Sequence, residues 1–181
     1  MKTALALVVF MLLIPVNARA QDGKLNLSFL DRLAERASEK QEVTLDESML
    51  KSVAPRLVAP GPKSDAARQV ISGLKGVYVR NYEFADNKAY SMDDIHAIRK
   101  QLSAPGWMKI VSNQEKGKDG DFDLQEIYFF QSNGKMGGIF IINAEPGELS
   151  VVNIVGSFDF SDLGALGGIL GIPNNITNSV K

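Results

Sequence analysis

Apolar residues recur every three or four positions in five stretches of the chain, which is the period of an amphipathic helix. Ser28 with Asp31, and Ser91 with Asp94, have the spacing of capping boxes that would open two of these helices. Pro55 is expected to end another, because proline lacks the backbone N–H and keeps the preceding residue out of the helical region. The pattern predicts helices over residues 28–38, 46–53, 64–74, 91–102 and 161–170.

Six other stretches are short and rich in β-branched and aromatic residues, as is typical of strands. The last four follow one another closely and are joined by turn residues, including Asn133-Gly134 and Glu145-Pro146-Gly147. Asn-Gly between two apolar runs is the strongest short signal for a hairpin, so these four strands are expected to form an antiparallel meander. The predicted strands cover residues 43–45, 77–84, 107–114, 122–131, 135–143 and 148–158.

These elements predict an α+β fold, an antiparallel β-meander sheet with helices packed on one face. An antiparallel sheet can leave one face to solvent, whereas the helices over 64–74, 91–102 and 161–170 each have an apolar side that needs cover. The segment 55–64 holds three of the seven prolines and is expected to be an exposed connector. About 160 residues follow the first twenty, which suits a single domain over residues 21–181.

The first twenty residues have the pattern of a cleaved signal peptide. Lys2 gives the positive start, residues 4–16 form an apolar run, and Ala18-Arg19-Ala20 fits the small-x-small cleavage pattern. The alternative, an uncleaved anchor, is disfavoured because the apolar run is too short to span a bilayer. We expect cleavage after Ala20 and an exported chain, periplasmic or extracellular, that is not transmembrane after cleavage.

Charge and cysteine content exclude several classes of protein. The whole chain has a net charge of −1, and removal of Lys2 and Arg19 with the leader leaves about −3. Nucleic-acid binders and polybasic membrane-surface proteins need a dense positive face, so neither kind of partner is expected. The chain has no cysteine, which excludes disulfides, thiolate metal sites, a cysteine nucleophile and a lipidated cysteine. An exported protein without disulfides fits a bacterial envelope better than an animal secretory pathway.

The sequence offers few residues for catalysis or metal binding. His96 is the only histidine, and a lone histidine inside a predicted helix is typical of an exposed or structural side chain. No GxSxG elbow, Walker P-loop or HExxH pattern occurs, so no catalytic residue, cofactor or enzymatic activity is expected. Asp119, Asp121 and Asp123 alternate as calcium ligands could, but the loop lacks the glycine and glutamate that an EF-hand needs. They are weak metal candidates, and a solvated hairpin tip is the favoured interpretation.

Two further patterns each leave two interpretations open. The glycine-rich segment 164–171 is expected to be a C-terminal helix packed on the sheet; the alternative is a small-residue surface for a partner or a membrane. Six aromatic residues alternate along the predicted strands and are expected in the core, unless several are exposed together as a ligand platform. They are Tyr78, Tyr82, Phe84, Trp107, Tyr128 and Phe130.

Four stretches, in order along the chain, carry a resemblance to a known family. They are a VTLD strand that runs into a helix within 43–53, a GLKGVYV strand entry at 73–79, a tryptophan strand at 107–110, and GSFDFSDL at 156–163. This pattern spans most of the mature chain and resembles the bacterial envelope family catalogued as domain of unknown function 4252. The resemblance implies an exported protein without established activity, near sigma and anti-sigma regulator genes, in envelope signalling or stress response. Many relatives resemble lipoproteins, but a lipid anchor is not carried over because this chain has no cysteine.

Three functions remain open at this point. We expect a non-enzymatic exported domain, accessory to envelope signalling, that binds an envelope protein through an exposed sheet face or an edge strand. The second hypothesis is a small-molecule or lipid binder with a pocket between helices and sheet, and the third is an uncharacterised hydrolase. A buried apolar cavity would favour the second, and acids gathered with His96 in a cleft would favour the third. A flat apolar patch without these features would favour the first.

Overall fold

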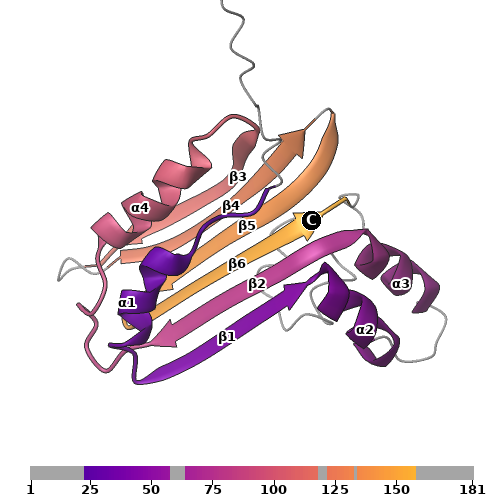
Figure 1. The fold of residues 1–181 in the computed structure, drawn as a ribbon. Helices are drawn as coiled ribbons and strands as arrows, with labels where there is room; N and C mark the ends of the chain where they lie inside the picture. Colours follow the sequence, from indigo (N-terminus) through magenta and orange to yellow (C-terminus); the bar gives the residue numbers. More distant parts are fainter. Residues whose placement is uncertain (1–22, 58–63, 118–121, 133, 158–181) are drawn as a thin grey trace, which may run out of the picture.

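The structure is a computed structural model that describes residues 23–57, 64–117, 122–132 and 134–157 (Figure 1). Its centre is a six-stranded antiparallel sheet in the order β1-β2-β6-β5-β4-β3. Helices pack against this sheet, so the chain has the predicted α+β fold. They lie on both faces and not on one as expected, because both faces of the central strands are apolar. The predicted signal peptide, the predicted helix over 161–170 with its glycine-rich part, and most of the proline-rich connector lie outside the described residues.

Four strands follow one another as the predicted meander: β3 (Trp107–Lys116), β4 (Phe122–Ser132), β5 (Lys135–Glu145) and β6 (Glu148–Gly156). Gly134 and Gly147 lie in the last two turns at φ angles of 74° and 79°, which glycine adopts without a steric penalty. β6 then pairs with β2 (Leu74–Glu83), and β2 pairs with β1 (Glu39–Asp46). Strands β1 and β3 are therefore the two edges of the sheet.

The first predicted helix is much shorter than expected. A 3-10 turn, η1 (Ser28–Leu30), leads into a single-turn helix, α1 (Asp31–Ala34), and the chain enters β1 at Glu39 rather than at position 43. Strand pairing decides this boundary, because β1 is in register with β2 along all eight of its residues. Hydrogen bonds between the strands satisfy the backbone there, so the helical period of the sequence is overridden.

The prediction that Pro55 ends a helix is wrong. Helix α2 (Glu47–Leu57) contains Pro55 in its last turn. At that position the missing N–H removes a single backbone hydrogen bond, and the fixed φ of proline is compatible with a helix. Helix α3 (Ser64–Gly73) ends one residue before the predicted end, and β2 starts at the next residue, three residues earlier than predicted.

Helix α4 (Met92–Leu102) begins with the predicted capping box at Ser91. The Ser91 backbone N–H donates to the Asp94 carboxylate at 2.8 Å. Asp94 is buried and also forms an ion pair with Arg32 of α1, so it both opens α4 and links the two helices. The capping box predicted at Ser28 does not form, because the Ser28 backbone N–H donates to Asn26 Oδ1 at 3.0 Å instead.

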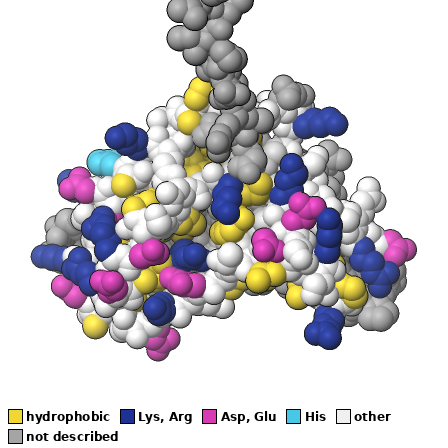
Figure 2. Space-filling view, viewed as in Figure 1, with side chains coloured by type: hydrophobic (Ala, Val, Ile, Leu, Met, Phe, Trp, Pro, Cys, Tyr) yellow, Lys and Arg dark blue, Asp and Glu magenta, His cyan; other side chains and the backbone are white. Residues whose placement is uncertain are grey.

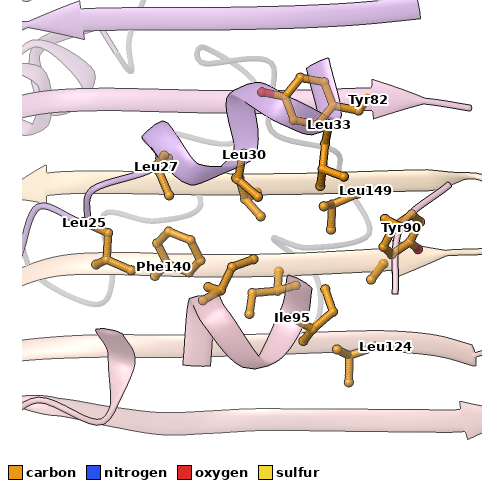
Figure 3. Close-up of a cluster of buried hydrophobic side chains, with 14 of the residues drawn as sticks. Leu25, Leu27, Leu30, Leu33, Tyr82, Tyr90, Ile95, Leu124, Phe140 and Leu149 are labelled. Atoms are coloured by element: carbon orange, nitrogen blue, oxygen red, sulfur yellow. The ribbon is translucent and has the colours of Figure 1, made fainter. Parts of the chain in front are cut away.

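One face of the sheet, the first face, carries a hydrophobic cluster beneath η1, α1 and α4 (Figures 1 and 3). Residues 23–30, which we call the strap, run across this face and insert leucines between the helices and the strands. Ile95 and Ile98 do the same from α4. Further members of the cluster are Leu25, Leu27, Leu30, Leu33, Tyr82, Leu124, Phe140 and Leu149.

The opposite face, the second face, carries another buried cluster, which Leu50 of α2 and Val70 of α3 join. α2 packs on β1 and β2 at this side of the sheet. Rows of β-branched residues cross the central strands in register, for example Val152 of β6 beside Ile141 of β5. Strands β5 and β6 are therefore buried on both faces, which explains their almost continuous apolar sequences. Within the described part of the chain, no helix is long and apolar enough to cross a bilayer.

Candidate functional site

A buried carboxylate fastens α4 to the sheet on the first face. Glu126 of β4 is fully buried, and Arg99 of α4 donates to it through Nε at 3.0 Å and Nη2 at 2.9 Å. Lys109 of β3 forms a second ion pair with the same carboxylate, and the Tyr128 hydroxyl donates to it at 2.8 Å. Both carboxylate oxygens of Glu126 therefore accept hydrogen bonds, and the donors come from α4, β3 and β4.

The electrostatics of this centre favour a structural role. Burial alone would raise the pKa of Glu126, but hydrogen bonds from Arg99, Lys109 and Tyr128 outweigh burial and hold that pKa below its usual range. Burial, together with the hydrogen bond to Glu126, raises the pKa of Tyr128. A general acid or base works best with a pKa near the operating pH, and both shifts lead away from neutrality. The centre is suited to hold α4 in place and is poorly suited to transfer protons.

Two amide side chains hold the strap on the first face. Asn153 of β6 is fully buried; its Oδ1 accepts the Leu25 N–H at 2.9 Å, and its Nδ2 donates to the Gly23 carbonyl at 3.0 Å. Gln101 of α4 accepts the Asn26 N–H at 3.0 Å and donates to the Asn26 carbonyl at 2.8 Å. An amide side chain presents a donor and an acceptor side by side, so each pairs with the strap backbone as a neighbouring strand would.

An open cavity of about 510 Å³ lies between the strap and strands β1 and β2. This volume lies in the range of sites that bind small molecules. Lys24 Nζ is 4.5 Å from the centre of the Tyr78 ring, which is a cation–π distance. The lining is mixed in polarity, so the cavity differs from the buried apolar pocket expected of a lipid binder. Its polar side chains are Lys24, Asn26, Ser28, Asp31, Thr44, Tyr78 and Arg80.

Strand β3 is an edge with exposed apolar side chains. Met108 is 46% exposed and Ile110 is 50% exposed; among the large apolar side chains of the described residues, only Met49 of α2 is comparable. The register shifts between Lys109 and Val111, which marks a β-bulge at Ile110. The other edge, β1, carries four charged residues among its eight, and charge protects an edge strand from pairing.

The register also aligns polar residues into two rows across the second face. Each row takes one residue from each of the six strands. Asp123 and Glu145 belong to the second row because each is one residue beyond the Leu124 and Ala144 pair. The first row consists of Gln41, Asn81, Ser150, Asn143, Gln125 and Asn113. The second row, at the end of the sheet, consists of the carboxylates Glu39, Glu83, Glu148, Glu145, Asp123 and Glu115.

The residues considered for chemistry from the sequence do not come together. His96 lies on the outside of α4, where its Nδ1 is 3.8 Å from Asp93 Oδ1; it is the cyan side chain in Figure 2. Asp123 is exposed on β4 in the carboxylate row, and Asp119 and Asp121 lie outside the described residues. Among the residues that the structure describes, no group of three or more histidines and carboxylates is arranged to hold a metal ion.

The aromatic residues take the core positions predicted for them. Tyr82, Phe84, Tyr128 and Phe130 are buried, and Tyr78 and Trp107 pack at the border of the first-face cluster. The Trp107 ring centre lies 5.3 Å from that of Phe130 and 6.5 Å from that of Phe140. These residues therefore form no exposed aromatic platform.

Three residues that organise the first face were not among the candidates from the sequence: Arg80, Glu126 and Asn153. A partial signal exists for two of them, since Glu126 and Asn153 are polar residues inside apolar strand sequences. Such a residue is buried only if it finds partners, and those partners come from distant segments. Arg80 is a polar residue of β2, and the contacts that fix it come from β1, which lies beside β2 only in the folded sheet.

A comparison with protein-family models decides the family. The model described as a domain of unknown function, DUF4252, matches residues 35–166, which is more than two thirds of the chain. The chain belongs to the DUF4252 family. This confirms the resemblance noted in the sequence. The DUF4252 match contains all six strands and helices α2 to α4, and it begins after the strap.

Two other comparisons add little to the DUF4252 assignment. No curated protein matches the sequence. A solved structure titled "Structure of crystal form III of TP0453" is 12% identical, with a match that covers 81% of this chain and 56% of that chain and a TM-score of 0.22. The chain thus spans little more than half the length of that protein. With so low a TM-score, the likeness supports no inference about fold or function.

Proposed function

We propose that this DUF4252 protein is a non-enzymatic interaction module of the bacterial envelope and that β3 binds an extended segment of an envelope protein. The proposal rests on the position of β3 at the edge of the sheet. No other described strand pairs with the outer side of β3, and Met108 and Ile110 are exposed there. A partner strand can pair with such an edge and cover its side chains, which is a recurring mode of peptide recognition.

The sequence of β3 specifies the partner segment that fits it. Residues 107–111 are mostly apolar, and residues 112–116 are all polar. A segment that adds antiparallel to β3 would place apolar side chains beside Met108 and Ile110 and polar side chains beside the second half of the strand. The proposed occupant is therefore an amphipathic extended segment, half apolar and half polar.

The electrostatics of the chain support the non-enzymatic part of the proposal. Glu126 is saturated with donors, its pKa is lowered, and the pKa of Tyr128 is raised, so neither is tuned for proton transfer at neutral pH. His96 is exposed beside Asp93 on the outside of α4. The role in envelope signalling rests on the family resemblance alone.

Export is part of the same proposal and has its own test. The protein isolated from the envelope fraction of its native host should have the mass of a chain that starts at Gln21. A mass that retains residues 1–20 would show an uncleaved leader and would overturn the proposed cleavage.

Crosslinking in the native host tests the contact. A photo-crosslinking amino acid is placed at Ile110 in the full chain, and at Met49 of α2 as a control with the same 50% exposure. Captured proteins are identified by mass spectrometry. We expect one envelope protein to be captured from Ile110 and not from Met49.

The identified protein is then purified and its affinity for three forms of the chain is measured. Ile110→Lys should weaken binding about tenfold or more, because a charge on an edge strand opposes pairing. Met49→Lys should bind like the wild type. Equal crosslinking at the two positions, or unchanged affinity in Ile110→Lys, would refute β3 as the contact.

A further inference from the structure

The guanidinium of Arg80 is held at one end only. Its Nη1 donates to the Val79 carbonyl at 2.9 Å and to the Val43 carbonyl and Thr44 Oγ1 at 3.3 Å each. These contacts fix the guanidinium against β1 and β2. Within the described residues its Nε and Nη2 donate no hydrogen bond, and Nε is buried.

The same molecule shows what that edge of an arginine can bind. Arg99 uses its Nε and Nη2 together to hold the carboxylate of Glu126. The two donors form a planar fork that matches the two oxygens of a carboxylate or a phosphate. Arg80 presents the same fork with its other end already fixed.

The neighbouring carboxylate does not fill this fork. Glu42 Oε1 is 3.8 Å from Arg80 Nε, which is beyond hydrogen-bond length, and it accepts the Tyr82 hydroxyl at 3.0 Å. The Glu42 side chain is 38% exposed, so it has room to move aside. Glu42 thus competes with an incoming anion without occupying its place.

Arg80 lines the open cavity beside the strap together with Lys24 and Tyr78. The described lining holds two cationic side chains, Lys24 and Arg80, and one carboxylate, Asp31. Tyr78 offers a ring, and Ser28 and Thr44 offer hydroxyls. The cavity therefore combines charged, hydroxyl and aromatic surfaces.

We propose that this cavity binds a small organic anion whose carboxylate or phosphate oxygens accept hydrogen bonds from Nε and Nη2 of Arg80. The Tyr78 ring packs against the body of the ligand, and Lys24 lies over that ring. The site lies at the β1–β2 side of the sheet, whereas the proposed protein contact is the opposite edge, β3. A result that refutes one proposal therefore does not affect the other.

An NMR titration of the ¹⁵N-labelled protein tests the site. The side-chain Nε–H signals of Arg80 and Arg99 are followed while sodium phosphate, benzoate or decanoate is added at constant ionic strength. We expect a saturable shift of the Arg80 signal and none of the Arg99 signal, because Glu126 already occupies that fork. The probe that saturates at the lowest concentration distinguishes a phosphate ligand from an aromatic or a fatty carboxylate.

Three variants test whether Arg80 and Glu42 determine the affinity for the anion. Arg80→Lys keeps the charge but loses the fork and should weaken binding about tenfold, as measured from the backbone amide signals of the lining residues, because this variant has no Arg80 Nε–H. Glu42→Gln should tighten binding, and Arg68→Lys on α3 should leave it unchanged. A shift that stays linear for all three probes, or Arg80→Lys binding as tightly as the wild type, would overturn the proposal. If Arg80→Lys fails to fold, the test is whether the Arg80 signal of the wild type shifts in a saturable way.

Discussion

Glu126 shows at the scale of a single residue how a charge is accommodated in a sheet of valine and isoleucine. Desolvation of an ion pair is costly, and the attraction between partners compensates only when the geometry is good and the remaining lone pairs are bonded. Here Arg99 supplies a two-pronged contact, and Lys109 and Tyr128 bond the remaining positions. Loss of the carboxylate would leave two cations facing each other at the edge of the core.

We therefore predict that Glu126→Gln lowers the free energy of unfolding by about 2–4 kcal/mol, less than for a fully buried pair because Arg99 and Lys109 are partly exposed. Urea denaturation measures the change. Glu115→Gln, at an exposed position of β3, is the control and should change stability by less than about 0.5 kcal/mol. Because the pKa of Glu126 is lowered by folding, its contribution is present above its unfolded pKa. The difference between variant and wild type should shrink as the pH falls through the folded pKa.

Asp94 offers a second test at this scale, with its neighbour as a matched control. Asp94 is buried, accepts the Ser91 N–H and pairs with Arg32, whereas the Asp93 side chain is 98% exposed. Asp94→Ala should lower the thermal midpoint, with a loss of about 1–2 kcal/mol typical of a helix cap. Asp93→Ala should change it little. Equal effects of the two variants would contradict the role of Asp94 at the start of α4.

At the scale of elements, the strap is joined to the sheet by side-chain amides and not by a strand ladder. Asn153 and Gln101 each contact the strap backbone in both directions. Gly23 lies at a φ of 76°, and a Cβ there would meet the Gly137 carbonyl at 2.9 Å, so the strap approaches β5 closely. The position of the strap, and with it one wall of the cavity, depends on these few contacts.

We predict that Asn153→Ala releases the strap. The substitution leaves the Leu25 N–H and two carbonyls without their partner in a buried place, which should cost about 2 kcal/mol or more. Hydrogen exchange should speed up at Leu25 and along residues 24–30 while the amides of β4 and β5 stay protected. Uniformly faster exchange throughout the sheet would instead indicate global destabilisation and contradict a local role.

At the scale of the whole molecule, the six-strand order assembles a row of six carboxylates that no short segment contains. Like charges on adjacent strands repel, and they do so most where solvent screens them least. Burial first, and then the charges of Glu145 and Glu83, raise the pKa of Glu148. Ionised Glu148 is thus a source of instability at neutral pH.

The raised pKa of Glu148 determines how stability changes with pH. Because the pKa of Glu148 is higher in the folded chain than in the unfolded chain, its stabilising contribution is full below the unfolded pKa. It is lost as the pH rises through the folded pKa. Glu148→Gln should therefore be more stable than the wild type at pH 7, and this gain should fall toward zero below the unfolded pKa. Thermal melts from pH 4 to pH 8 check this, and added salt should narrow the difference.

Local patterns along the chain were sufficient to predict the meander and helix α4. Strands β3 to β6 are joined by short turns with Gly134 and Gly147, and the capping box at Ser91 involves residues three apart. Such signals are complete within a few residues, so no distant contact is needed to interpret them. The family assignment follows from the same order of local patterns.

The features that the local patterns did not predict depend on contacts between segments that are far apart in the sequence. The length of β1, the shortened helix at Ser28 and the continuation of α2 through Pro55 depend on what lies beside each segment. The carboxylate row exists only once β2 has docked against β6. The ion-pair partners of Glu126 come from α4 and β3, and Arg80 is fixed by contacts from β1. The sequence by itself determined the elements and their turns, because those rest on neighbours along the chain. Only the tertiary structure decided the sites, because a site joins side chains that are far apart in sequence and pair through the sheet.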